Sequence, residues 1–214
     1  AAQARWHGFE FQLGRMIGLD RADRSITVAA VPDADGVPML PRRVLRYTTL
    51  VLALDGTINT FNIPGAVEHA IALDSPVQAD RFRQKLIAAC MRADARAERG
   101  EAHQVSIAII GAGATGVELA AELRNTSKVL AAYGIHDMDP HRDVRLTVIE
   151  GAERILPGLS ERISGSVSKL LHGMDIETLT GERVTQVRGD GVSTASGKDL
   201  RADLIVWAAG IKAP

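Results

Sequence analysis

The sequence lacks the features that mark disulfide-bonded, membrane-spanning and nucleic-acid-binding proteins. Cys90 is the only cysteine, which excludes an internal disulfide or a redox-active pair of thiols and fits a reducing, cytoplasmic compartment. No apolar run approaches the length of about 18 residues that a membrane-spanning helix needs. The net charge is −1, without a long run of one sign, so charge gives no reason to expect nucleic acid as a partner.

Metal-ligand patterns and nucleophilic triads are missing as well. The six histidines are scattered without the spacing of metal ligands, so we expect surface or structural roles for them and no metal site. We expect Cys90 to be a small buried residue on a helix. With 214 residues, 46% apolar and 24% charged, the chain has the composition of one large or two small globular domains.

The stretch SIAIIGAGATGVELAAEL, residues 106–123, has the pattern of a dinucleotide-binding turn. The apolar run 105–110 is typical of a parallel strand that is buried on both faces. Gly111, Gly113 and Gly116 follow it as G-x-G-x-x-G. The first glycine permits the tight turn, the second lets the backbone approach a pyrophosphate, and the third lets the helix pack close to the strand.

The residues after the turn complete this motif. From Ala114 and Thr115 onward, apolar residues recur at helical spacing. The free N–H groups and the positive dipole end of such a helix would hold the pyrophosphate. A second strand, 144–149, ends in Glu150, whose carboxylate can accept hydrogen bonds from the ribose hydroxyls. The alternative for Glu150 is a solvent-exposed strand end.

One spacing departs from the simple pattern. Glu150 lies 34 residues after Gly116, whereas the usual offset is about 20. We attribute the difference to the insertion at 125–143, which lengthens the helix and adds a polar surface loop containing Pro140.

The remaining sequence predicts further elements. Residues 9–31 have the pattern of an antiparallel hairpin, and the apolar run 45–54 that of a strand. A long amphipathic helix is predicted over 76–99, with Asp74 or Ser75 as N-cap, Pro76 at its first position and Gly100 as its stop. The residues predicted to share its buried face are Phe82, Leu86, Ile87, Cys90 and Met91.

A second helix over 160–173 is followed by several short strands between 176 and 210, which predict a β-meander and a final apolar strand. Similar apolar strands thus lie on either side of the nucleotide motif. This arrangement indicates an α/β fold in which a Rossmann-like domain, 101–207, is inserted into another domain formed by 1–100 and 208–214.

Several stretches in combination resemble bacterial type II NADH dehydrogenases, members of the two-dinucleotide-domain flavoprotein superfamily. They are TLVLAL, NTFNIPG, HAIALDSPVQADRFRQKL, IIGAGATGVELAAEL, VIEGAERILPGLSERIS and ADLIVWAAGIKAP. The resemblance covers about residues 40 to 214. It implies that the motif at 111–116 is the second of two nucleotide motifs, the one for NADH, and that 1–100 belongs to a partial FAD-type domain.

The resemblance also implies roles for individual residues. Gly111, Gly113 and Gly116 match the NADH pyrophosphate turn, and Glu150 matches the ribose-binding acid. A 2′-phosphate would meet the charge of Glu150 with no arginine immediately beside it, so we expect NADH to be preferred over NADPH by about tenfold or more.

Three further positions follow from the same resemblance. Glu118 matches a glutamate near the nicotinamide, at its contact with the flavin, and is our candidate catalytic residue. The alternative is an acid stabilised by the helix dipole. Ala209 and Gly210 match small residues beside the nicotinamide, and their alternative is a plain tight turn. Asp55 departs from the glycine–serine pair that is common in the family.

In the family, hydride passes from NADH to FAD and electrons then pass to a quinone. We expect this chain to be an internal part of such a protein, with an incomplete FAD site and no activity on its own. The full-length protein would be a respiratory enzyme on the cytoplasmic face of the inner membrane, attached peripherally by a segment outside this chain, and a homodimer. Two alternatives stay open: a non-catalytic NADH-binding module, and another flavin-dependent oxidoreductase of the ferredoxin reductase or NADH peroxidase type.

Overall fold

The computed structural model describes residues 8–53, 56–101, 104–132, 139 and 141–212. The chain divides into two compact units, residues 1–54 and 55–214. Each unit is described by itself below.

The first unit is a small antiparallel structure. Its three-stranded sheet has the order β1 (Met16–Asp20), β2 (Ser25–Val28), β5 (Arg43–Arg46), and a separate pair joins β3 (Val31–Pro32) to β4 (Pro38–Leu40). β1 and β2 pair antiparallel across a short turn. The hairpin that the sequence predicted within 9–31 is therefore confirmed.

The strand predicted over 45–54 is wrong for most of its length. β5 ends at Arg46, and residues 47–53 belong to no strand. Val51 is 81% exposed and Leu52 52% exposed. An extended segment becomes a strand only when a neighbour completes its hydrogen-bond ladder. Among the described residues, the bond from Tyr47 N–H to the carbonyl of Arg24 at 3.0 Å extends the pairing of β5 by one residue, and no strand pairs with 48–53. Asp55 lies outside the described residues.

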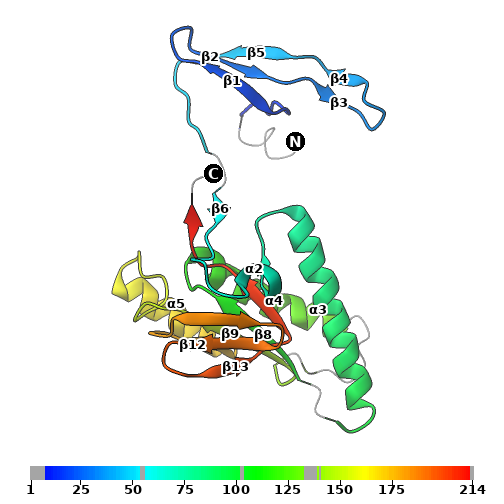
Figure 1. Ribbon diagram of the computed structural model, residues 1–214, viewed down its shortest axis with the longest axis vertical. Helices are drawn as coiled ribbons and strands as arrows, with labels where there is room; N and C mark the ends of the chain where they lie inside the picture. Colours follow the sequence, from blue (N-terminus) through cyan, green and yellow to red (C-terminus); the bar gives the residue numbers. More distant parts are fainter. Residues whose placement is uncertain (1–7, 54–55, 102–103, 133–138, 140, 213–214) are drawn as a thin grey trace. The chain divides into compact units, whose positions relative to one another are not determined.

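The second unit is built on a parallel sheet, as the sequence predicted (Figure 1). Its strand order is β10 (Ile176–Leu179), β9 (Val144–Ile149), β8 (Val105–Ile110), β14 (Leu204–Trp207), β7 (Ile71–Ala72). All four neighbouring pairs are parallel. Each of the central strands is almost entirely buried, which explains why it is a continuous apolar run in the sequence.

The two faces of this sheet carry different layers. Ile107 and Ile109 face a cluster that includes residues of three helices, α3 (Pro76–Ala97), α4 (Ala114–Ala132) and α5 (Glu161–Gly173). Ala108 and Ile110, which alternate with them along β8, face the other cluster. That cluster contains side chains of the antiparallel meander β11 (Val184–Arg188), β12 (Gly191–Thr194), β13 (Asp199–Arg201) and of the short helix α2 (Ala66–His69). The predicted β-meander and α/β class are confirmed.

Helix α3 confirms most of the prediction made for residues 76–99. Ser75 is the N-cap, and its Oγ accepts a hydrogen bond from the backbone N–H of Gln78 at 3.3 Å, with Pro76 in the first turn. The buried stripe is formed by Phe82, Leu86, Ala89, Cys90 and Ala93, with Ile87 half-buried.

Met91 does not belong to the buried stripe of α3. Its side chain is 63% exposed, because position 91 is rotated about 100° from its buried neighbour Cys90. Cys90 is the small buried residue that the sequence predicted, and burial raises the pKa of its thiol.

Residues on both sides of the nucleotide motif meet in this unit. The short strand β6 (Thr57–Ile58) pairs antiparallel with β15 (Ile211–Lys212), and β7 adds an edge strand to the parallel sheet beside β14. The pairing of β6 with β15 fits a chain that leaves one domain and returns to it after 207. The boundaries at 100 and 207 stay a prediction about the longer protein.

A buried arginine ties α4 to the sheet. Arg124 is fully buried, and its guanidinium donates hydrogen bonds to backbone carbonyls of the described residues Val144 at 2.9 Å, Met174 at 2.8 Å and Asp175 at 2.8 Å. Desolvation lowers the pKa of Arg124 below its usual value. The planar guanidinium of an arginine suits this task, since its several donors can reach three carbonyls at once; the bond to Val144 is buried and the other two are partly buried.

Replacing Arg124 by methionine should therefore destabilise this unit strongly. A buried carbonyl that is left without its donor costs about 1–3 kcal/mol. Since the bond to Val144 is buried and those to the other two carbonyls are partly buried, we expect Arg124→Met to lower the free energy of unfolding by about 3 kcal/mol in urea titrations. Arg145→Met is the matched control. Arg145 forms an exposed ion pair with Glu177 at 2.8 Å, and such pairs contribute about 0–1 kcal/mol. Equal losses in the two variants would contradict the role of Arg124.

A second polar cluster fixes the start of the meander. The Glu182 carboxylate is buried and accepts hydrogen bonds from Lys198 Nζ at 2.6 Å and Ser196 Oγ at 2.7 Å. These bonds, that from Lys198 first, lower the pKa of Glu182 to about 2. Since the folded-state pKa lies below the usual 4.5, this cluster stabilises the fold above pH 4.5 and loses its contribution as the pH falls toward 2.

Glu182→Gln should consequently reduce the acid sensitivity of the fold. We expect the wild-type chain to lose more of its free energy of unfolding between pH 5 and about pH 3 than the variant does, because only the wild type must protonate the hydrogen-bonded carboxylate of Glu182. Urea titrations at several pH values, followed by circular dichroism, measure this difference. Glu122→Gln, at an exposed position of α4, should keep the wild-type pH dependence. A Glu182→Gln variant with that same dependence would show that the cluster does not act this way.

Candidate functional site

The glycine turn between β8 and α4 forms a backbone cradle in which two glycines are required by close packing. Gly111 has a φ of +104°, and a Cβ there would lie 2.7 Å from the backbone of Ala209. A Cβ on Gly116 would lie 1.9 Å from the carbonyl oxygen of Gly111. A side chain at either position would push α4 and the end of β14 away from the turn.

Gly113 is different, because its missing side chain leaves open space. A Cβ at Gly113 would meet no described heavy atom within 4 Å. The residue lies directly before α4, and its carbonyl accepts the first helical hydrogen bond, from Val117 N–H at 3.1 Å. The N–H groups of the preceding turn have no intrahelical acceptor and carry the positive end of the helix dipole. This open cradle suits an anion such as a pyrophosphate.

Glu150 directly follows β9, and its carboxylate accepts hydrogen bonds from two separate backbone segments. Its Oε2 accepts a hydrogen bond from Ala112 N–H at 2.8 Å, and its Oε1 accepts one from Ala152 N–H at 2.9 Å. A carboxylate has about four acceptor sites, so the remaining lone pairs can accept hydrogen bonds from ribose hydroxyls. The sequence predicted the position of Glu150 but not its second task of holding the glycine turn against the next loop.

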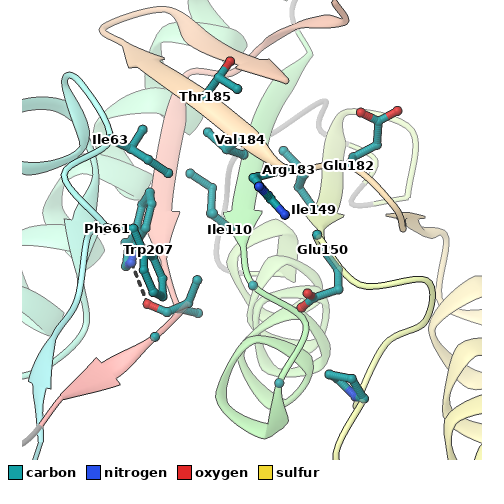
Figure 2. A pocket seen from close by; sticks show the side chains of 17 residues that line it. Phe61, Ile63, Ile110, Ile149, Glu150, Glu182, Arg183, Val184, Thr185 and Trp207 are labelled. Atoms are coloured by element: carbon teal, nitrogen blue, oxygen red, sulfur yellow. Dashed lines mark hydrogen bonds between the residues drawn. The ribbon is translucent and has the colours of Figure 1, made fainter. Parts of the chain in front are cut away.

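A cavity of about 790 Å³ lies against this cradle (Figure 2). Its walls come from the glycine turn, the ends of β9 and β14, the start of β11 and the segment before α2. The lining residues are Phe61, Ile63, Ile110, Gly111, Gly113, Ile149, Glu150, Gly151, Pro157, Glu182, Arg183, Val184, Thr185, Trp207, Ala208, Ala209 and Gly210. The cavity therefore lies outside the carboxyl ends of the parallel strands, which is where ligands bind in open α/β sheets.

Two aromatic residues line this cavity near Gly210. The Trp207 Nε1–H donates to the carbonyls of Ala209 at 2.6 Å and Asn59 at 3.1 Å, which joins the end of β14 to the segment after β6. The ring of Phe61 covers Gly210 so closely that a Cβ there would lie 2.5 Å from Phe61 Cζ. Sequence reasoning missed both residues. For Phe61 the signal was NTFNIPG, an irregular segment with an aromatic residue, and for Trp207 it was the tryptophan in ADLIVWAAGIKAP.

The predicted site residues divide into those that line the cavity and those that do not. Gly111, Gly113, Glu150, Ala209 and Gly210 line it. Gly116 is buried beneath the turn, where its role is packing. The remaining three, Ala114, Thr115 and Glu118, are exposed on the first turns of α4 and do not line the cavity.

Arg183 is a lining residue that the sequence did not single out. It lies at the start of the meander, 33 residues along the chain from Glu150, and faces the same cavity. We expected no arginine immediately beside Glu150, and that expectation did not consider Arg183, which lines the same cavity.

Other kinds of site find no support in the described part of the chain. Among the described residues, no group of three or more His, Cys, Asp or Glu side chains is placed to hold a metal ion. Among the same residues, no helix has both the length and the apolar character needed to cross a membrane.

Comparisons with known proteins agree with this geometry. The chain is 34% identical to a type II NADH:quinone oxidoreductase of Haemophilus influenzae over 99% of its own length and 50% of that protein. It is 31% identical to an external alternative NAD(P)H-ubiquinone oxidoreductase of Solanum tuberosum, over 78% of this chain and 30% of the relative. The chain thus spans about half the length, or less, of these curated relatives.

Among solved structures, the chain resembles NDH2 from Plasmodium falciparum in complex with NADH, with a TM-score of 0.64 at 22% identity, over 90% of this chain and 39% of that one. This likeness supports the fold. The sequence also matches the family described as pyridine nucleotide-disulphide oxidoreductase over residues 3–214. With its open glycine cradle and its carboxylate at the end of β9, the chain belongs to the pyridine nucleotide-disulphide oxidoreductase family.

Proposed function

We propose that this chain is the NADH-binding part of a flavin-dependent NADH dehydrogenase. The observation that carries the proposal is the contrast among the three glycines. At Gly111 and Gly116, backbone atoms fill the space that a side chain would need, whereas Gly113 faces open space at the start of a helix. Packing alone explains Gly111 and Gly116 but gives no reason for Gly113, whereas a pyrophosphate in contact with the backbone does.

We expect the described residues that line the cavity to hold NADH along its length. The cradle at Gly113 would hold the pyrophosphate, and Glu150 would accept hydrogen bonds from the adenosine ribose. Ala209 and Gly210 leave room for the nicotinamide end, with Trp207 and Phe61 as apolar walls. When bound, NADH supplies the hydride that the flavin accepts. The residues of this chain orient the dinucleotide and exclude water from it.

The partners of the longer protein are part of the same proposal. The names of the Haemophilus and Solanum relatives include quinone acceptors, which favours a quinone over a protein acceptor for this chain. We further infer that segments of the longer protein complete the FAD-binding site. Peripheral attachment to the cytoplasmic face of the inner membrane and a homodimeric state are proposed on the family resemblance.

Gly113→Ala tests the cradle directly. A Cβ at Gly113 meets no described atom within 4 Å, so the variant should fold as well as the wild type. The methyl group would occupy the space of the pyrophosphate, and we expect NADH affinity to fall by about tenfold or more. Calorimetric titration of the full-length protein with NADH, together with its melting temperature, separates these two effects.

Gly165→Ala is the matched control for this substitution. Gly165 lies within α5, and a Cβ there also meets no described atom within 4 Å. This variant should keep the affinity for NADH, with a small gain in stability from the higher helix propensity of alanine. Unchanged NADH affinity in Gly113→Ala would remove the cradle from nucleotide binding.

Glu118 stays our candidate for the contact between nicotinamide and flavin, although its side chain is exposed in this chain. In the full-length, FAD-containing protein, we expect Glu118→Gln to slow flavin reduction by NADH in stopped-flow measurements and to change stability little. If Glu118 acts only on the helix dipole, the variant instead loses about 0.3–1 kcal/mol of stability and reduces its flavin at the wild-type rate. That second result would end the catalytic assignment.

A further inference from the structure

The charged side chains that line the cavity differ in whether they have a hydrogen-bond or ion-pair partner. Glu150 accepts two backbone hydrogen bonds, and Glu182 is paired with Lys198. Figure 2 shows the Glu182 carboxylate turned away from Glu150. Arg183 is the third charged lining residue, and it makes no side-chain hydrogen bond or ion pair with any described residue. The cavity therefore contains a cationic side chain that has no partner among the described residues.

The backbone places this cation at the adenosine end of the cavity. The N–H of Glu182 donates to the carbonyl of Glu150 at 2.9 Å, and the N–H of Gly181 donates to that of Ala152 at 2.8 Å. The carbonyl of Arg183 accepts from Ala195 N–H at 2.8 Å. A Cβ on Gly151 would lie 3.9 Å from both Cα and Cβ of Arg183. Arg183 is thus fixed beside the residue that follows Glu150.

Figure 2 shows the guanidinium of Arg183 extending from the start of β11 toward Glu150. Its side chain is exposed toward the cavity, so it can rotate to meet a ligand. An arginine presents a planar fork of donors that matches phosphate oxygens. The ribose hydroxyls that Glu150 would bind include the one that carries the extra phosphate in NADPH.

We propose that Arg183 binds the 2′-phosphate of NADPH, so that this cavity accepts NADPH as a second pyridine nucleotide. The inference rests on the proposed function, since it requires the adenosine ribose to lie at Glu150. Glu150 repels the 2′-phosphate and Arg183 attracts it. The preference for NADH is therefore smaller than the tenfold or more that Glu150 alone would impose.

The test is calorimetric titration of the full-length protein with NADH and with NADPH at low and at moderate salt. We expect Arg183→Met to weaken NADPH binding by about tenfold and NADH binding by less than about threefold, because only NADPH loses a charge-assisted contact. Arg183→Lys should retain part of the NADPH affinity, since it keeps the charge but loses the fork. Arg201→Met is the matched control: Arg201 is an exposed residue of β13 that does not line the cavity, and both affinities should stay at wild-type values.

The outcomes separate this inference from the function on which it rests. Equal weakening of both nucleotides in Arg183→Met would assign Arg183 to the shared part of the dinucleotide and overturn the inference. So would a wild-type protein that binds NADH but not NADPH, or an Arg183→Met variant whose affinities for both nucleotides are unchanged. In each of these cases NADH binding survives, and with it the proposed function. A folded wild-type protein that binds neither nucleotide would overturn both.

Discussion

The site depends on the carboxylate of Glu150, which joins two backbone segments at the carboxyl ends of the parallel strands. Its two oxygens accept the N–H groups of Ala112 in the glycine turn and Ala152 in the following loop. The carbonyl of Glu150 in turn accepts the N–H of Glu182, which fixes the start of the meander. One residue therefore holds three walls of the cavity in register. Because it uses part of its acceptor capacity for this purpose, the cradle keeps its shape before any ligand arrives, which lowers the entropic cost of binding.

The two layers on the parallel sheet divide the remaining work. The helical side provides most of the hydrophobic core, and Arg124 donates hydrogen bonds to backbone carbonyls within it. The meander side provides the ligand-facing wall and is anchored separately by Glu182 and Lys198. The cavity is lined by the strand ends, the glycine turn and the start of the meander. None of the described residues that line it belongs to α3, α4 or α5, so the helical core can stay packed while a ligand binds on the other side.

The sequence predicted those parts of the structure that rest on local patterns. The glycine turn, Glu150, helices α3 and α5, and the meander each have a periodicity or turn signal of their own. The predictions for Met91 and for the strand over 45–54 were wrong because both depend on partners elsewhere in the fold. Burial of Met91 depends on which side of α3 packs on the sheet, and the strand depends on a neighbour that completes its hydrogen-bond ladder. Trp207, Phe61 and Arg183 were missed for a related reason. They reach the cavity through pairings between segments far apart in the chain, which no local pattern records.

Glu150 and Arg183 also differ in what a substitution would cost the fold. The Glu150 carboxylate satisfies two backbone amides, so its loss affects folding together with ligand binding. Arg183 contributes its backbone to the fold through the bond from Ala195, while its side chain has no partner among the described residues. An exposed side chain of this kind can change with little effect on stability. Substitutions at position 183 can therefore change the preference between the two nucleotides while the hydrogen bonds of Glu150 are kept. In this cavity, one residue maintains the structure of the site and another sets its selectivity.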